Sequence, residues 1–238
     1  MKIYEIKWCL DTLNLYLGCT PHEGCDKCCA VALSKRYGHD LRGNPKLRRV
    51  ITCPFDQLNE IQRVAMKSGE PRRVYIRNIT DSVTLREELF SRIDEGQYPD
   101  LIFLLLTKKP SNILEYIPLS WKTRCPDNVM FGTSIVNQST TDRLIPRLLK
   151  VPGYRFLSIE PQLDELTLKP WISTGSIHGV IQGGDSGPKR RPFNNNWASQ
   201  LKDECIHAGV PYFFKNLRIN AAGLSVPAHL SFNKLKHG

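Results

Sequence analysis

The sequence alternates short, nearly continuous apolar runs with amphipathic segments along almost its whole length. Continuous apolar runs are typical of parallel strands that are buried on both faces, and amphipathic segments are typical of helices that cover a sheet. This alternation predicts an α/β protein with mostly parallel strands and right-handed crossovers. An open doubly wound sheet and a partial or complete (β/α) TIM-like barrel both fit this order. The predicted strands span residues 13–17, 73–77, 101–106, 129–135, 154–159, 178–182 and 211–215, and the predicted helices span residues 26–37, 57–67, 83–95, 139–150 and 195–208.

Several helix ends carry recognisable signals. Ser139 or Thr140 is a suitable N-cap for one predicted helix, and the run of asparagines at 194–196 is suitable for another. Gly96 and Gly209 follow predicted helices, at positions where a glycine commonly ends a helix.

The composition indicates in which compartment the protein works and what kind of partner it binds. The 238 residues are 41% hydrophobic, yet they contain no apolar run long enough to span a bilayer and no N-terminal signal peptide. We therefore expect a cytoplasmic protein without a membrane partner, whose scattered cysteines Cys9, Cys53, Cys125 and Cys205 are small core residues. The net charge of +10 favours an anionic partner such as DNA, RNA or a nucleotide. A merely basic, solvated surface is an equally good explanation, because no recognised nucleic-acid-binding motif accompanies the charge.

Three cysteines, Cys19, Cys25 and Cys28, are crowded into the loop after the first predicted strand. Close thiols in a short loop are more often ligands than packing residues. Three ligands suit a metal or cluster that keeps one position open, whereas a structural zinc site needs a fourth ligand, such as His22 or Cys29. The residues alone leave an iron–sulfur cluster, a zinc knuckle and a disulfide as alternatives.

Polar residues follow nearly every predicted strand. In parallel α/β folds, ligands gather at the carboxyl ends of the strands, so these residues predict one shared site. The Gly183-Gly184 turn is neither a P-loop nor a dinucleotide-binding fingerprint, but its backbone can closely approach a ligand. Capping a helix and ending a strand are the simpler alternatives for Asp81 and Glu160, respectively. The predicted ligand-binding residues are Asn78, Asp81, Thr107, Lys108, Ser134, Glu160, Gly183, Gly184, Asp185 and Ser186.

The order of these motifs resembles a bacterial and phage family of radical-SAM-like proteins, largely uncharacterised and associated with three-Cys-motif partner proteins. The resemblance covers roughly residues 8–215. Two features depart from the expected patterns: Cys29 stands where the family usually has a tyrosine, and the five residues between Cys19 and Cys25 exceed the three of the common radical-SAM signature. The matching segments are Gly18-Cys19, Gly24-Cys25-Asp26-Lys27-Cys28, the stretch 78–81, Leu106-Thr107-Lys108-Lys109-Pro110, the stretch 132–138, Ser158-Ile159-Glu160-Pro161, and the stretches 183–188 and 209–215.

The resemblance implies a barrel of the radical-SAM type over residues 1–217, with a C-terminal extension over 218–238. It implies a [4Fe–4S] cluster bound by Cys19, Cys25 and Cys28, with S-adenosylmethionine at the open iron and against the polar strand ends. The expected function is reductive cleavage of S-adenosylmethionine to act on an unknown substrate, such as a nucleic acid or nucleotide. A three-Cys-motif protein is the implied protein partner. The alternative is a non-catalytic zinc or iron–sulfur protein that binds nucleic acid.

Overall fold

The structure is a computed structural model, and it describes residues 11–14, 16–17, 23, 49–50, 54–77, 83–185 and 190–215. Seven strands form one sheet in which every neighbouring pair is parallel. In spatial order these are β1 (Asp11–Asn14), β4 (Arg72–Arg77), β5 (Leu101–Thr107), β6 (Val129–Ser134), β7 (Tyr154–Ile159), β8 (Val180–Gly183) and β9 (Tyr212–Lys215).

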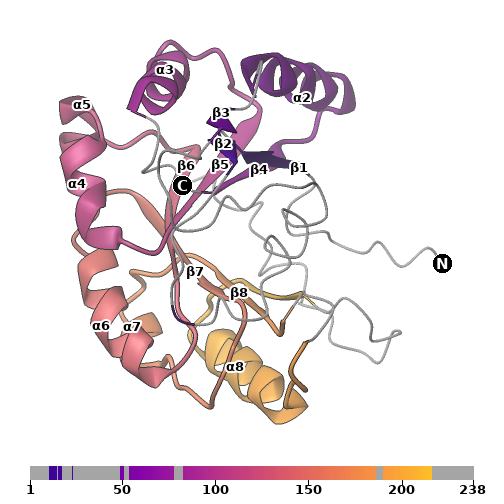
Figure 1. Cartoon of the computed structure of the whole chain (residues 1–238), viewed down its shortest axis with the longest axis vertical. Coiled ribbons are helices and arrows are strands. Elements are labelled where there is room, and N and C mark those ends of the chain that lie inside the picture. Colours follow the sequence, from indigo (N-terminus) through magenta and orange to yellow (C-terminus); the bar gives the residue numbers. More distant parts are fainter. Residues whose placement is uncertain are drawn as a thin grey trace.

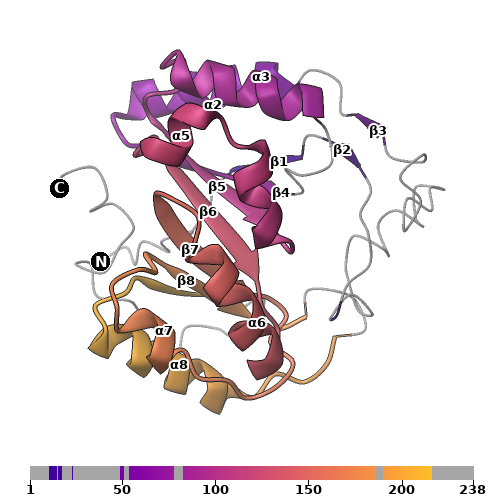
Figure 2. The same ribbon diagram turned by 90° about the vertical axis from the view of Figure 1, so that its left-hand side faces the viewer.

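The spatial order of these strands is also their order along the chain. A doubly wound sheet reverses its order at a switch point, and this sheet has no reversal. The sheet curls into a half-barrel, as Figures 1 and 2 show. The prediction of an α/β fold with a partial barrel is thereby confirmed.

Helices cover the convex face of the half-barrel (Figure 1). In α2, for example, Phe55, Leu58, Ile61 and Ala65 are buried on one side, which gives the helical spacing of an amphipathic segment. Gly96 and Gly209 have φ angles of +72° and +67°, so the predicted glycine stops are confirmed. The helices are α2 (Pro54–Ser68), α3 (Val83–Asp94), α4 (Ile113–Tyr116), α5 (Leu119–Thr123), α6 (Gln138–Leu148), α7 (Lys169–Ile172) and α8 (Asn195–His207), with a 3₁₀ turn at Pro110–Asn112.

The sheet is buried on both faces, and this explains its continuous apolar runs. In β5, Phe103 and Leu105 belong to the large core beneath the helices, whereas Ile102 and Leu104 belong to a second cluster on the concave face. The full concave cluster is Tyr75, Ile102, Leu104, Met130, Phe156 and Ile181, with Leu106, Tyr154 and Phe213 packed against it. The concave face therefore has an apolar floor.

Two local predictions differ from the structure. The predicted strand at 13–17 is divided into β1 and β2 (Tyr16–Leu17), and β2 pairs antiparallel with β3 (Arg49–Val50). Helix α6 is capped by Asn137, and not by Ser139 or Thr140. The reason is a capping box: the Asn137 side chain accepts from the Thr140 amide at 2.9 Å, and the Thr140 hydroxyl accepts from the Asn137 amide at 3.1 Å.

Three other predictions concern residues outside the described ranges. The predicted helix at 26–37 lies outside them, and so do Cys9 and Cys53. The proposed domain boundary at residue 217 also lies outside, just after β9, and stays a prediction. None of the helices that the structure describes is long and apolar enough to cross a membrane.

Candidate functional site at the carboxyl edge

Polar side chains replace the apolar floor where the strands reach their carboxyl ends. Side chains alternate between the two faces of a strand, so Ser134 shares the concave face with Met130, and Ser158 shares it with Phe156. These two serines are paired in the register of β6 and β7, and both are buried. Their hydroxyl groups form a polar layer directly above the apolar floor.

An ion pair lies at the same edge. Lys215, at the end of β9, donates from Nζ to Glu160 Oε1 at 2.8 Å, and Glu160 directly follows β7. The pair spans β8 at Gly183, where a Cβ would lie 2.9 Å from the Lys215 carbonyl oxygen and 3.7 Å from Glu160 Cγ. The side chains are 25% and 13% exposed, so this is a half-buried pair at the mouth of the half-barrel.

Gly184 and Asp185 both contact residues of the segment before α8. A Cβ at Gly184 would lie 3.2 Å from Phe193, so the missing side chain makes room for that ring. The Asp185 carboxylate accepts from the Arg191 guanidinium at 2.7 and 2.9 Å and from the Arg191 amide at 2.9 Å. These bonds join Arg191, which precedes α8, to Asp185, which follows β8.

Thr107 forms hydrogen bonds that stabilise the turn after β5. Its hydroxyl accepts from the Lys109 amide at 3.0 Å, and its carbonyl accepts from the Thr133 hydroxyl at 3.0 Å. These bonds shape the turn after β5 that carries Lys108. The structure thus brings Ser134, Glu160 and Gly183 together, while Thr107 and Asp185 stabilise neighbouring turns.

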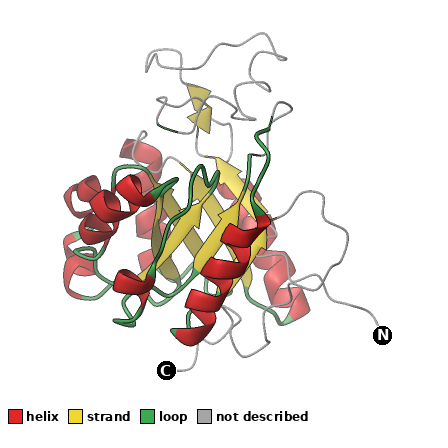
Figure 3. Ribbon diagram, turned by 90° about the horizontal axis from the view of Figure 1, so that it is seen from below, coloured by secondary structure: helices red, strands yellow, loops and turns green. Residues whose placement is uncertain are grey.

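Two described residues, Leu17 and Glu23, show that the segment with the cysteines begins at the carboxyl edge and contacts it. One residue separates β1 from β2, so Leu17 lies just beyond the end of the sheet, and Figure 3 shows the two-stranded sheet beyond that edge. Glu23 accepts through Oε1 from Asn137 Nδ2 at 2.6 Å, beside the N-terminus of α6. The predicted site residues that lie outside the described ranges are Cys19, Cys25, Cys28, Asn78, Asp81 and Ser186, together with His22 and Cys29.

A buried polar network supports β8 from the helical side. Gln182 donates to Gln162 and accepts from the Tyr212 hydroxyl, and Gln162 donates to the Asp164 carbonyl at 2.8 Å. Burial raises the pKa of the Tyr212 phenol far above its usual range, which keeps it a neutral donor. The network holds β8 and β9 in the register that brings Gly183 beside Lys215.

The two thiols in the described part of the chain, Cys125 and Cys205, are poor metal ligands. Burial raises the pKa of Cys125 to about 12 and raises the pKa of Cys205 still further. Among the described residues, no three His, Cys, Asp or Glu side chains are grouped closely enough to bind a metal ion. Cys205 is fully buried in the core, as predicted, and the half-buried Cys125 packs against the core.

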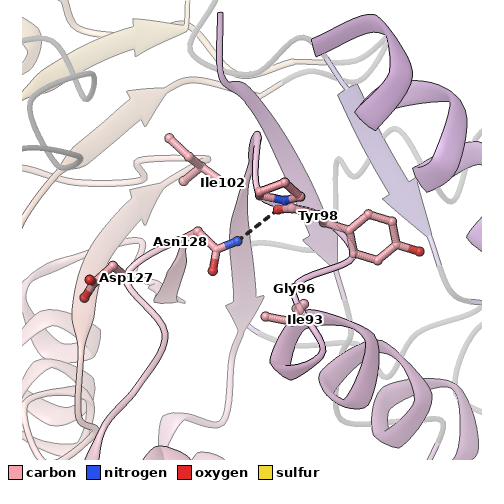
Figure 4. Close-up of a pocket in the computed structure, with 7 residues that line it drawn as sticks. Ile93, Gly96, Tyr98, Ile102, Asp127 and Asn128 are labelled. Atoms are coloured by element: carbon pink, nitrogen blue, oxygen red, sulfur yellow. Dashed lines mark hydrogen bonds between the residues drawn. The ribbon is translucent and has the colours of Figure 1, made fainter. Parts of the chain in front are cut away.

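A hollow of about 300 Å³ lies at the opposite, amino edge of the sheet (Figure 4). Asn128 Nδ2 donates to the Tyr98 carbonyl across it at 3.2 Å. Its lining includes none of the predicted site residues and consists of Ile93, Gly96, Tyr98, Pro99, Ile102, Asp127 and Asn128. We therefore place the candidate site at the carboxyl edge.

A family described as "Protein of unknown function (DUF5131)" matches residues 4–222. The chain belongs to this family. The match covers every described strand of the DUF5131 half-barrel, and the family description assigns no activity. No curated protein and no solved structure matches the chain significantly. The function of this DUF5131 protein must therefore be argued from its own residues.

Three residues of this DUF5131 site, Ser158, Lys215 and Asn137, belong to the polar segments that follow predicted strands but were not among the predicted ligand-binding residues. Ser158 and Lys215 stand at predicted strand ends, and that position was the available signal. Asn137 also follows a predicted strand, but the sequence could not show its contact with Glu23, because the two residues are 114 positions apart.

Proposed function

We propose that this protein is an iron–sulfur enzyme of the radical-SAM type, with its site at the carboxyl edge of the half-barrel. One observation carries the proposal. Asn137 binds Glu23, within the cysteine loop, at the same sheet edge as Ser134, Ser158, Glu160 and Lys215. Candidate metal ligands and candidate substrate contacts thus share one end of the fold.

Chain length limits how far the cysteines can lie from this edge. Cys19 is two residues after Leu17, and Cys25 is two residues after Glu23. Consecutive Cα atoms are about 3.8 Å apart, so each of these cysteines has its Cα within about 7.6 Å of a described residue at the edge. Cys28 follows Cys25 by three residues, so its Cα is within about 11 Å of the Cα of Cys25.

The donor set fits an iron–sulfur cluster. Thiolates are the preferred ligands of such clusters, and Cys19, Cys25 and Cys28 would bind three irons and leave the fourth for a ligand. When bound, the cluster supplies the electron that cleaves S-adenosylmethionine reductively. The apolar concave floor supports the proposal because it excludes water beneath the polar layer.

The remaining site residues would bind and orient ligands. Ser134 and Ser158 offer hydroxyl donors and acceptors on the concave face. Glu160 offers a carboxylate to an amine or to a ribose hydroxyl, and Lys215 holds that carboxylate in place at 2.8 Å. Lys108, just after β5, supplies a further positive charge near the strand ends for a carboxylate or a phosphate.

Anaerobic reconstitution tests the proposal. The whole protein should bind about four irons per chain with matching sulfide and a broad brown absorption. With dithionite and S-adenosylmethionine it should form 5′-deoxyadenosine. Replacing Cys19, Cys25 or Cys28 by alanine should abolish both properties, whereas Cys125→Ala should retain them. A colourless protein that binds zinc, or a fully loaded cluster that leaves S-adenosylmethionine intact, would overturn the proposal.

Asn137→Asp tests whether the loop anchor matters. An aspartate can still cap α6, but it cannot donate to Glu23 and it repels that carboxylate. We expect unchanged unfolding of the metal-free protein and lower iron content after reconstitution. The matched control is Asn194→Asp at the N-cap of α8, which should change neither. Equal iron content in both variants would show that the anchor is dispensable.

A further inference from the structure

Three aromatic rings form a contiguous group on the α8 side of the carboxyl edge. Phe193 lies 5.3 Å from Phe214 and 5.8 Å from Trp197, measured between ring centroids. Phe193 belongs to the loop before α8, Trp197 to the first turns of α8, and Phe214 to β9. We call this group the aromatic platform. Figure 1 shows α8 alongside β8, among the last strands in the order of the sheet.

The aromatic platform is only partly used for packing. All three residues are half-buried, and Phe214 packs against the core beneath the helices. Phe193 and Trp197 are not among the residues assigned to either core cluster in the described part of the chain. Large aromatic side chains that stay half-exposed at a site edge commonly bind a partner.

The described segment just before Phe193 is anchored beside the end of β8. Arg191 ties it to Asp185 through three hydrogen bonds, and the absent side chain at Gly184 leaves space for the Phe193 ring. Phe193 therefore lies two residues after an anchored arginine and packs against Gly184, so little conformational entropy is lost when a ligand stacks on it.

The surroundings of the platform favour an anion. Arg190 is exposed and lies three residues before Phe193. The first turn of α8 carries no acidic residue, and Asn194, Asn195 and Asn196 are exposed there. Half-buried aromatic rings beside exposed cationic and amide side chains can bind unpaired nucleotides, because the bases stack on the rings and the phosphates meet the positive charge.

We propose that Phe193 and Trp197 stack against unpaired bases of single-stranded nucleic acid, and that Arg190 contacts its backbone. The inference goes beyond the proposed function, because stacking requires neither cluster nor S-adenosylmethionine. A duplex is a poorer fit, since its base faces are already stacked. The net charge of +10 adds a general attraction to polyanions.

Fluorescence anisotropy of labelled twelve-nucleotide poly(dT) and poly(U) with the cofactor-free protein tests the inference. We expect either strand to bind more tightly than a duplex of equal length. Each stacked base contributes about 1–3 kcal/mol, so Trp197→Leu should weaken binding about 5- to 150-fold. Arg190→Gln should weaken it too and should lower the salt slope by about 0.7. The control Arg147→Gln, at an exposed position on α6, should leave binding unchanged.

Quenching of tryptophan fluorescence gives a second measurement of binding, and a folding defect would not produce the same result. Oligonucleotide binding should quench the wild-type emission. Trp197→Phe keeps an aromatic ring, so it should retain most of the affinity but lose the quenching. The inference is overturned if Trp197→Leu, with a native melting curve, binds like the wild type. It is also overturned if duplex binds as tightly as single strand, or if Arg147→Gln weakens binding as much as Arg190→Gln. The test needs no cluster, so it can fail independently of S-adenosylmethionine cleavage.

Discussion

Gly132 shows how one missing side chain shapes the concave face of the sheet. A Cβ at this position would lie 2.3 Å from Cζ of Phe156, because the Phe156 ring crosses β6 at this point. Phe156 is fully buried and is part of the apolar floor. The glycine therefore makes room for a ring from the neighbouring strand, directly below Ser134 and Ser158.

Gly132→Ala should destabilise the protein by about 1–3 kcal/mol, because the ring or the strand must move. Urea unfolding of the cofactor-free protein measures the change. Phe156→Leu removes the ring atoms that clash, so adding Gly132→Ala to that variant should cost less than adding it to the wild type. Equal costs in the two backgrounds would show that Phe156 is not the obstacle.

At the scale of the elements, His178 joins the amino ends of β7 and β8. Its Nδ1 accepts from the Arg155 amide at 3.1 Å, and its ring packs edge-on against Tyr154. Arg155 also donates to the carbonyl groups of Leu149 and Val151 after α6, at 3.1 and 2.6 Å. One strand end thus connects two strands and a helix terminus.

Burial and the nearby Arg155 charge lower the pKa of His178 below its usual value of 6.5. The native state favours the neutral ring, so its stability is full above about pH 6.5 and falls as the pH drops through the lowered value. His178→Asn keeps an acceptor but cannot titrate. Its unfolding free energy should therefore fall less than that of the wild type between about pH 7.5 and about pH 5.

At the scale of the whole molecule, the half-barrel gathers residues that the sequence keeps far apart. Glu160 and Lys215 are 55 positions apart, and they meet because β7, β8 and β9 are neighbours in one parallel sheet. The pair joins the edge strand β9 to β7 across β8, at the mouth of the proposed site.

A double-mutant cycle with Glu160→Gln and Lys215→Met should give a coupling of about 0.5–1.5 kcal/mol in urea unfolding. The pair is half-buried, so salt should reduce this coupling only partly. The matched control is the exposed Glu60–Arg63 pair on α2, whose side chains are 57% and 54% exposed. A Glu160–Lys215 coupling no larger than that of the control would refute a structural role for the ion pair.

Periodicity predicted most of the elements, because local hydrophobic patterns reflect burial directly. The strands at 101–106 and 154–159 and the helix at 195–208 agree with β5, β7 and α8 to within one residue at each end. The short helices α4, α5 and α7 were missed, because four or five residues carry too little pattern. The cap of α6 was misplaced, because Asn137 competes with two other good capping residues nearby.

The sequence by itself determined the class of the fold and the edge at which polar residues gather. Both depend on local patterns, namely apolar runs and the residues that follow them. Only the tertiary structure decided between a doubly wound sheet and a half-barrel, since strand order is a long-range property. It also decided which polar residues meet: Glu160 with Lys215, Asp185 with Arg191, and Glu23 with Asn137. The first and last of these contacts join residues that are distant in the chain, and they exist because the parallel sheet brings its strand ends to one edge.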